Sequence, residues 1–166
     1  MVTQEQRERE DKYDVGANFA VPALDEVVPP GGRVERTELN LESLYFDTED
    51  RDLLRNAVTL RRRSGDSDNG WHLKVPAGLA RTEIRLALTT GKAVPKELRD
   101  LTLGLRRGRA LQPIALLRTT RSATRIFDDH DLVIAEIADD QVQATALGPA
   151  ATFTEWREVE VELGTA

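Results

Sequence analysis

Charged side chains recur at every second position in several segments, and this alternation constrains the fold more than any other feature of the chain. The last such segment, EVEVEL over residues 158–163, alternates glutamates with apolar residues. Successive side chains of a β-strand point to opposite faces, so a period of two places all three glutamates on one face. Like charges on one face repel each other unless cations lie close to them. The segment therefore predicts a strand whose charged face meets basic groups or metal ions.

Three earlier segments also carry charged residues two positions apart, which form a ladder of charges on one face of a strand. They are EREDK over residues 8–12, RRR over residues 61–63 and RTEIR over residues 81–85. Any one of them alone is typical of a sheet face exposed to solvent, which is the commoner arrangement. Acidic and basic ladders taken together favour a barrel that encloses them, with its apolar faces turned outward against helices. The interior of such a barrel is a polar tunnel.

Strand formers and turn signals divide the chain into about eight strands and two or three helices. The predicted strands cover residues 7–15, 33–47, 57–64, 71–76, 81–88, 111–127, 131–138, 141–146 and 152–163. A short helix is expected over residues 22–28, a short helix or turn over residues 49–56, and a longer helix from Pro95 through the leucines at 98, 101 and 105. The predicted fold class is α+β and mainly β, an eight-stranded antiparallel β-barrel with flanking helices. A chain of 166 residues is expected to form one domain, over residues 1–166.

Composition excludes several kinds of site. The chain has no cysteine, which rules out disulfides, iron–sulfur clusters and thiol nucleophiles. Its two histidines, His72 and His130, are too few for a multi-histidine metal site. His72 alternates with Lys74, which would let it line the tunnel, but we interpret it as a core or surface residue, and His130 as an exposed turn residue. The N-terminus lacks the apolar core of a signal peptide and no stretch is long enough to span a bilayer, so a cytoplasmic protein without membrane contact is expected.

The net charge of −6 conceals an uneven distribution. Residues 51–127 carry 17 Lys/Arg against 6 Asp/Glu, whereas residues 128–166 carry 1 Arg against 10 Asp/Glu. Arginine forks suit phosphate oxygens, and carboxylates suit hard cations such as Mg²⁺ or Mn²⁺. A chain of several phosphates with a divalent metal ion is a ligand that uses both. Nucleic acid is disfavoured, because the chain is acidic overall and has no stacking aromatics among its basic residues.

Eight short motifs follow one another along the chain. They are EREDK (8–12), YFDT (45–48), LRRR (60–63), WHLKVP (71–76), RTE (81–83), LRTTR (117–121), EIADD (136–140) and EVEVE (158–162). In this order they resemble the motifs of the CYTH domain family, also called the triphosphate tunnel metalloenzymes, over nearly the whole chain. The resemblance implies an eight-stranded antiparallel tunnel that binds triphosphates together with divalent metal ions.

The resemblance also assigns roles to particular residues. The implied metal ligands are Glu8, Glu10, Glu158 and Glu160, with Glu136, Asp140 and Glu162 as further acidic candidates. The implied phosphate-binding residues are Lys12, Arg61, Arg63, Lys74, Arg81, Arg85, Arg118 and Arg121. The implied catalytic residues are Glu8, Glu10 and Lys12, with Lys12 orienting or activating the attacking water. The RTTR spacing leaves open which of Arg118 and Arg121 faces the tunnel, and Arg125 is a further candidate there.

The function that the resemblance implies is metal-dependent hydrolysis of inorganic triphosphate or of a nucleoside triphosphate, with Mg²⁺ or Mn²⁺. Two alternatives stay open, a non-catalytic module that binds polyphosphate or nucleotides, and a class IV-type adenylate cyclase of the same fold. The expected partner is thus a triphosphate-containing small molecule or polyphosphate. In the full-length protein, a C-terminal CHAD domain, linked to polyphosphate in this family, is expected to follow.

Overall fold

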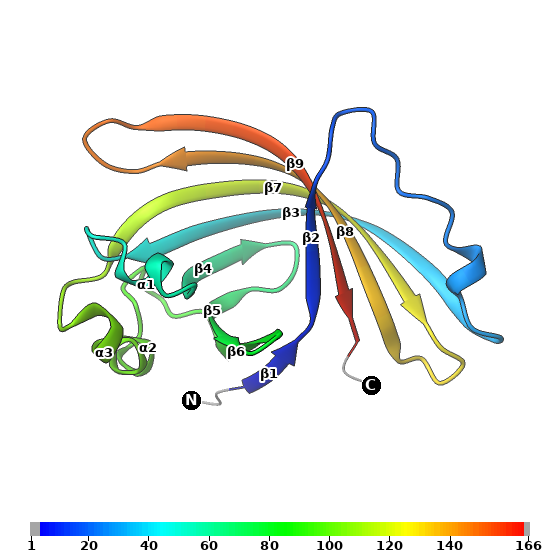
Figure 1. Cartoon of the computed structure of the whole chain (residues 1–166), viewed down its shortest axis with the longest axis horizontal. Coiled ribbons are helices and arrows are strands. Elements are labelled where there is room, and N and C mark those ends of the chain that lie inside the picture. The colour runs from blue at the N-terminus through cyan, green and yellow to red at the C-terminus, as the bar shows by residue number, and fades with distance from the viewer. Residues whose placement is uncertain (1–3, 165–166) are drawn as a thin grey trace.

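One antiparallel β-sheet dominates the computed structural model, which describes residues 4–164 (Figure 1). Its strands are β1 (Gln4–Glu8), β2 (Glu10–Asp14), β3 (Arg33–Asp47), β4 (Thr59–Gly65), β5 (Gly70–Ala77), β6 (Ala80–Leu86), β7 (Gln112–Phe127), β8 (Val133–Ala146) and β9 (Thr152–Leu163). Their order in the sheet is β1-β6-β5-β4-β3-β7-β8-β9-β2, and all neighbours are antiparallel. The mainly β, antiparallel fold predicted from the sequence is confirmed.

The N-terminal chain contacts both edges of this sheet. β1 pairs with β6 and β2 pairs with β9, and only Arg9 separates β1 from β2. The Arg9 carbonyl accepts a hydrogen bond of 3.0 Å from the Leu163 amide, which holds the crossing point against β9. The sheet therefore curls around an interior, with β1 and β2 between β6 and β9 (Figure 1). The strand predicted over residues 7–15 is interrupted, and counting β1 and β2 as one gives the eight expected strands.

Two predicted strands, over residues 131–138 and 141–146, form a single strand, β8. Its middle carries Asp139 and Asp140, a residue type that is depleted in strands. Antiparallel partners on both sides nevertheless keep the backbone paired. Asp139 pairs with Arg157 at 2.6 Å and Asp140 pairs with Arg121 at 2.7 Å, so each carboxylate has a cation on its own face of the sheet.

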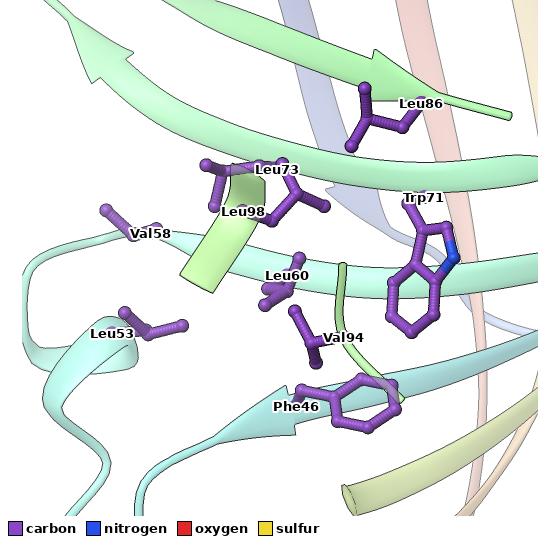
Figure 2. Packing of buried hydrophobic residues seen from close by; sticks show 9 residues of the cluster. All are labelled: Phe46, Leu53, Val58, Leu60, Trp71, Leu73, Leu86, Val94 and Leu98. Atoms are coloured by element: carbon purple, nitrogen blue, oxygen red, sulfur yellow. The ribbon is translucent and has the colours of Figure 1, made fainter. Parts of the chain in front are cut away.

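The outer face of β3, β4, β5 and β6 forms the larger apolar core (Figure 2). Its buried members are Phe46, Leu53, Val58, Leu60, Trp71, Leu73, Leu86, Val94 and Leu98. On β4 and β5 these residues alternate with charged ones, so the period of two turns them away from the interior. The rings of Phe46 and Trp71 lie 5.4 Å apart in a tilted arrangement, which is favourable for aromatic pairs. The prediction that apolar strand faces turn outward, with Trp71 in outer packing, is confirmed.

A second apolar core lies on the outer face of β7, β8 and β9, beneath the segment that links β2 to β3. Its buried members are Ile126, Ile137 and Val159. Val21 and Leu24 of the linking segment pack against them. A cavity of about 880 Å³, lined mainly by apolar side chains, lies between the segment and the strands.

The helices are short and lie outside the sheet. They are α1 (Asp52–Arg55), α2 (Lys96–Leu101) and α3 (Leu103–Arg106), with a 3-10 turn, η1 (Asp25–Val27). The Asp47 carboxylate accepts hydrogen bonds from the amides of Leu53 and Leu54, at 2.9 and 3.0 Å, and so caps the start of α1. None of the described helices has the length and the apolar character that crossing a lipid bilayer requires.

Two helix predictions were too long. The helix expected from Pro95 is split at Thr102, whose hydroxyl donates to the Leu98 carbonyl at 2.8 Å, and such bonding weakens a helix interior. Leu98 is fully buried, but Leu101 is 56% exposed, so the leucines do not form one buried stripe. Residues 22–28 form only the turn η1, because a run this short before two prolines cannot propagate a helix.

Replacement of Leu60 tests the larger outer core. Leu60 is 0% exposed, so Leu60→Ala should lower the free energy of unfolding by about 2–5 kcal/mol, through lost burial and the cavity left behind. Urea unfolding at neutral pH measures this change. Leu79, which is 104% exposed, provides the control, and Leu79→Ala should change the value by less than about 0.5 kcal/mol. Equal stabilities for the two variants would contradict the described packing.

Candidate functional site

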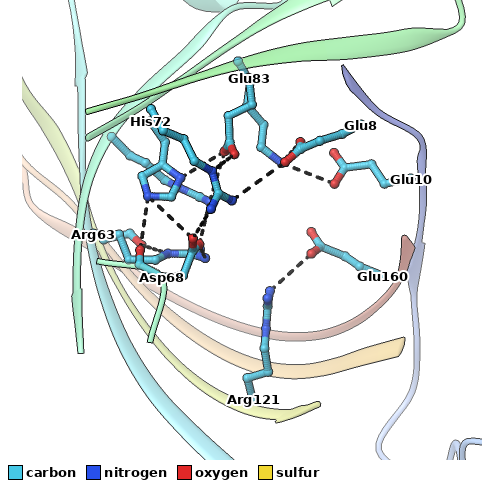
Figure 3. Close-up of polar contacts among 12 residues, drawn as sticks. Glu8, Glu10, Arg63, Asp68, His72, Glu83, Arg121 and Glu160 are labelled. Carbon is cyan, nitrogen blue, oxygen red and sulfur yellow. Dashed lines mark hydrogen bonds and ion pairs between the residues drawn. The ribbon is translucent and has the colours of Figure 1, made fainter. Parts of the chain in front are cut away.

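Cationic side chains from β4, β5 and β6 share the inner face of the curled sheet (Figure 3). Arg61 and Arg63 lie on β4, Lys74 on β5 and Arg85 on β6. The register places Arg61 opposite His72 and His72 opposite Arg85, so the three strands present these groups side by side. The side chains of Arg61 and Arg63 are only 14% and 7% exposed. Cations buried this far need anions close to them.

The fully buried carboxylate of Glu83 lies among these cations (Figure 3). Its Oε1 is 3.0 Å from Nδ1 of His72, and its Oε2 accepts a hydrogen bond from Arg85. Burial opposes ionisation of Glu83, but these two partners outweigh it and hold its pKa well below the usual range. Burial raises the pKa of the nearby Glu8 to about 7, although Lys74 Nζ is 2.6 Å from its Oε2. Glu83 is therefore a fixed anion, whereas Glu8 changes charge near neutral pH.

A further buried cation, Arg121 of β7, faces the acidic strands. It donates two hydrogen bonds of 2.7 Å to the Asp140 carboxylate and a third, of 3.2 Å, to Glu160. Burial disfavours the charged guanidinium, but the bonds to Asp140 and the charge of Glu160 outweigh it and raise the pKa of Arg121. Arg121 thus stays charged and links the basic part of the interior to the acidic part.

Carboxylates occupy the inner face of β8, β9 and β2. The register pairs Glu136 with Glu162 and Glu162 with Glu10, so three glutamates form a row across neighbouring strands. Burial raises the pKa of Glu162, and Glu10 and Glu136 add to this against the opposing charge of Lys74. A row of like charges is costly without a cation among them. We call the inner faces of β8, β9 and β2 the acidic wall, and the inner faces of β4 to β7 the basic wall.

One cavity of about 640 Å³ brings the two walls together. Arg85 and Arg121 line it from the basic wall, and Glu136 and Glu162 line it from the acidic wall. The basic wall suits the oxygens of an extended anion, and the acidic wall suits hard cations.

Comparison with known proteins places the chain in a family. A family model for the CYTH domain matches residues 22–166. The chain belongs to the CYTH domain family. Uncharacterized proteins from two strains of Mycobacterium tuberculosis are 39% identical to it over 170 residues, which cover 95% of this chain and 33% of each relative. This CYTH chain therefore spans about a third of the length of the curated relatives that it matches.

Solved structures share the CYTH fold described above. A candidate adenylate cyclase from Bacillus halodurans superposes with a TM-score of 0.66 at 20% identity, covering 98% of this chain and 82% of its own. A candidate adenylate cyclase from Vibrio parahaemolyticus gives a TM-score of 0.53 at 17% identity, covering 96% and 77%. At such identities the likeness establishes the fold alone. The predicted family and fold are confirmed.

Most of the predicted site residues lie on the inner face of the CYTH domain. They are Glu8, Glu10, Lys12, Arg61, Arg63, Lys74, Arg85, Arg121, Glu136, Asp140, Glu158, Glu160 and Glu162. Lys12 pairs with Glu158 at 3.1 Å and with Glu160 at 2.5 Å. Burial opposes the charge of Lys12, but these ion pairs outweigh it and raise the pKa of Lys12. Lys12 therefore remains an ammonium group, which cannot act as a proton acceptor.

Arg118 and Arg81, which were predicted to bind phosphate, do not lie among the inner cations of the basic wall. Arg118 and Arg121 are three positions apart, so on β7 they point to opposite faces. The Arg118 side chain is 68% exposed and pairs with Glu42 at 3.2 Å. Arg118 therefore lies on the outer face, away from the predicted phosphate-binding residues, and Arg121 takes the inner position. Arg81, near the start of β6, donates to the Ala57 carbonyl at 2.7 Å. Arg81 is thus engaged with the backbone at the end of the basic wall.

The sequence did not predict three further residues of the CYTH interior. His72 is buried on the inner face, and its alternation with Lys74 was the signal for that position. The Tyr45 hydroxyl lies 3.4 Å from Arg61, and the cationic Arg61 lowers the pKa of Tyr45 although burial opposes this. Asp68 lies in the turn between β4 and β5, where no periodicity exists to reveal its direction.

The acidic wall fits a hard divalent cation, although its carboxylates are spread over several strands. Within residues 4–164, no three His, Asp or Glu side chains form a preformed metal cluster. Glu8 Oε2 is buried and accepts no well-oriented hydrogen bond from the described residues, although Lys74 is close. Glu10, Glu136 and Glu162 form the like-charged row beside it. Lys74 lies 3.4 Å from Glu10 and Arg125 lies 2.6 Å from Glu136, but burial and the two neighbouring glutamates still raise the pKa of Glu162. Carboxylate oxygens are the ligand type that Mg²⁺ and Mn²⁺ prefer.

The raised pKa of Glu8 predicts a loss of stability on going to neutral pH. Folded Glu8 keeps its proton up to about pH 7, whereas unfolded Glu8 loses it near 4.5. The stabilising contribution is complete below the lower value and disappears as the pH rises through the upper one. Urea unfolding with a chelator present, between these pH values, should therefore show a decline that is smaller for Glu8→Gln, in which Glu162, whose pKa is also raised, still contributes. The exposed Glu5 gives the control, because Glu5→Gln should keep the decline, and parallel curves for Glu8→Gln and the wild type would contradict the assignment.

Proposed function

We propose that this CYTH domain hydrolyses the triphosphate group of a small molecule, with Mg²⁺ or Mn²⁺ as cofactor. The observation that carries this proposal is a cavity of about 640 Å³ that Arg85 and Arg121 line from the basic wall and Glu136 and Glu162 line from the acidic wall. A chain of phosphates is long enough to use the whole basic wall, and a metal ion on the acidic wall is close enough to contact it. The substrate class is inorganic triphosphate or a nucleoside triphosphate.

The side chains of the basic wall would bind the phosphate groups. Arg61, Arg63 and Arg85 lie on adjacent strands, and Lys74 and Arg121 extend the set toward the acidic wall. Arginine binds phosphate oxygens through paired N–H groups, and lysine acts as a compact charge. Because the side chains of Arg61, Arg63 and Arg121 are mostly buried, water screens them poorly and their attraction for phosphate is strong.

The acidic wall would hold the metal ion through Glu10, Glu136 and Glu162, with Glu8 beside them. A divalent ion bound there would polarise phosphate oxygens and acidify a water molecule. In the reaction, the water oxygen forms a bond to the terminal phosphorus while the anhydride P–O bond breaks. The electron pair of that bond leaves with the shortened phosphate chain, and the proton of the water passes to solvent. Arg121 and Lys12, which stay charged, stabilise the terminal group and orient the water.

We also propose a domain organisation and a cellular location for the protein. Residues 1–166 would form a single domain, a CHAD domain would follow it, and the protein would be cytoplasmic. The greater length of the curated relatives is consistent with a further domain in the full-length protein. Polyphosphate would then be an alternative ligand of the same basic wall.

Two arginines of one strand test the basic wall. Arg121→Gln removes an inner cation, and the dissociation constant for triphosphate should rise about tenfold or more, the worth of a charge-assisted hydrogen bond. Arg118→Gln removes an outer cation of β7 and should change the constant by less than about threefold. Isothermal titration calorimetry measures both, and circular dichroism checks that both variants are folded. Equal losses would mean that triphosphate is bound by the general charge of the protein.

Metal dependence tests the reaction itself. Phosphate release from inorganic triphosphate and from ATP should require Mg²⁺ or Mn²⁺ and stop with a chelator. Glu162→Gln, on the acidic wall, should lower the rate by about tenfold to a hundredfold, as loss of a partner in a metal site does. The control is Glu155→Gln on the same strand, where the exposed Glu155 accepts a bond of 2.8 Å from Gln143. It should retain the wild-type rate.

Other outcomes of this assay would select the alternatives. Formation of cyclic AMP and pyrophosphate from ATP would identify an adenylate cyclase and overturn the hydrolase. Tight binding of triphosphate without turnover, in folded protein with metal present, would identify a binding module.

A further inference from the structure

The carboxylate of Asp68 lies among the arginines of the basic wall (Figure 3). Its Oδ2 is 3.0 Å from Nη1 of Arg63 and 3.8 Å from Nη2 of Arg61. Its Oδ1 is 2.8 Å from Nη1 of Arg85. One side chain from a turn therefore contacts cations on β4 and β6, with the geometry that an oxyanion between these strands would have.

The turn that carries Asp68 is tied to the sheet on both sides of it. Before it, the Asp66 amide donates to the Asn40 carbonyl at 3.0 Å, and the Asn40 amide donates to the Asp66 carboxylate at 2.7 Å. After it, Nε2 of His72 lies 3.1 Å from the Asp68 carbonyl. Asp68 itself has a φ of 55°, a left-handed conformation that Asp adopts more readily than most residues with a Cβ.

Asp68 is the more displaceable of the two anions that neutralise these arginines. Glu83 is fully buried within a strand and is bound by His72 and Arg85. The Asp68 side chain is 24% exposed and comes from a turn. Asp68 and Arg85 line the 640 Å³ cavity and also a second cavity of about 280 Å³. The second cavity gives the Asp68 carboxylate a space to move into when another anion takes its place.

We propose that Asp68 is an internal competitor of the substrate, a carboxylate that a phosphate group must displace from Arg61, Arg63 and Arg85. This inference rests on the proposed function. The free energy needed to displace the Asp68 carboxylate from the arginines is the same for every anion that replaces it. It therefore sets a minimum affinity that an anion must exceed to bind. A single phosphate gains little beyond the contacts that Asp68 gives up. A triphosphate also reaches Lys74 and Arg121, and the free energy of these added contacts exceeds the free energy of displacing Asp68. Asp68 thereby restricts the site to anions with several phosphates.

The sign of an affinity change tests the proposal. Asp68→Asn removes the competing charge with little change of shape, and Asn tolerates the left-handed conformation. The dissociation constants of orthophosphate, pyrophosphate and triphosphate, measured by calorimetry with a chelator present, should each fall by about tenfold, the worth of a charged hydrogen bond. Asp68→Gly also removes the carboxylate, and Gly adopts a positive φ without cost. It should give the same gain in affinity, and it provides a second variant if Asp68→Asn does not fold.

The control removes the same charge outside the site. Glu42→Gln unpairs Arg118 on the outer face and should leave all three constants within about threefold of the wild type. Weaker binding by both Asp68 variants, with normal binding by the wild type, would overturn the competitor and show that Asp68 positions the arginines. Failure of the wild type and of both variants to bind triphosphate, both with the chelator and after addition of Mg²⁺, would instead overturn the proposed function. Binding by the variants alone would support both.

Discussion

Compensation of buried charge inside the curled sheet is the constraint on which the rest of the structure depends. Arg121 illustrates it, because this single guanidinium satisfies Asp140 and Glu160 and joins the two walls. Buried ions of one sign are costly unless ions of the other sign lie close to them. The arginines of β4 and β6 accordingly surround Glu83 and Asp68. In the row of glutamates, Glu10 and Glu136 are paired with Lys74 and Arg125, but burial and these two neighbours raise the pKa of Glu162. A divalent cation beside Glu162 would relieve this repulsion.

A polar interior requires the apolar cores to lie elsewhere, and the strands provide for this by alternation. Leu60 and Trp71 point outward against the short helices, while Arg61 and His72 point inward from the same strands. The helices need little stability of their own, because they are held by packing on the sheet and by caps such as Asp47. Closure by the N-terminal chain then places the acidic wall next to the basic one.

The sequence predicts well whatever depends on the period of two. That period predicts most of the strands, the outward apolar faces and most of the inner charges, and the family resemblance was confirmed. It could not give the break at Arg9, which depends on pairing with two different edges. The predicted helix lengths were wrong because contacts such as the hydrogen bond from the Thr102 hydroxyl to the Leu98 carbonyl decide where a helix ends. Asp68 was missed because the direction of a turn residue follows from the packed strands around it. Position in the fold, and not residue type, separates Arg121 from Arg118.

A crystal structure of the protein with triphosphate and Mn²⁺ tests the central claim most directly, because Mn²⁺ is located by its anomalous scattering. The account predicts phosphate groups against Arg61, Arg63 and Arg121, and the metal ion between the phosphates and the row of Glu10, Glu136 and Glu162. Phosphate bound only to outer cations such as Arg118, with no metal ion on the acidic wall, would contradict it.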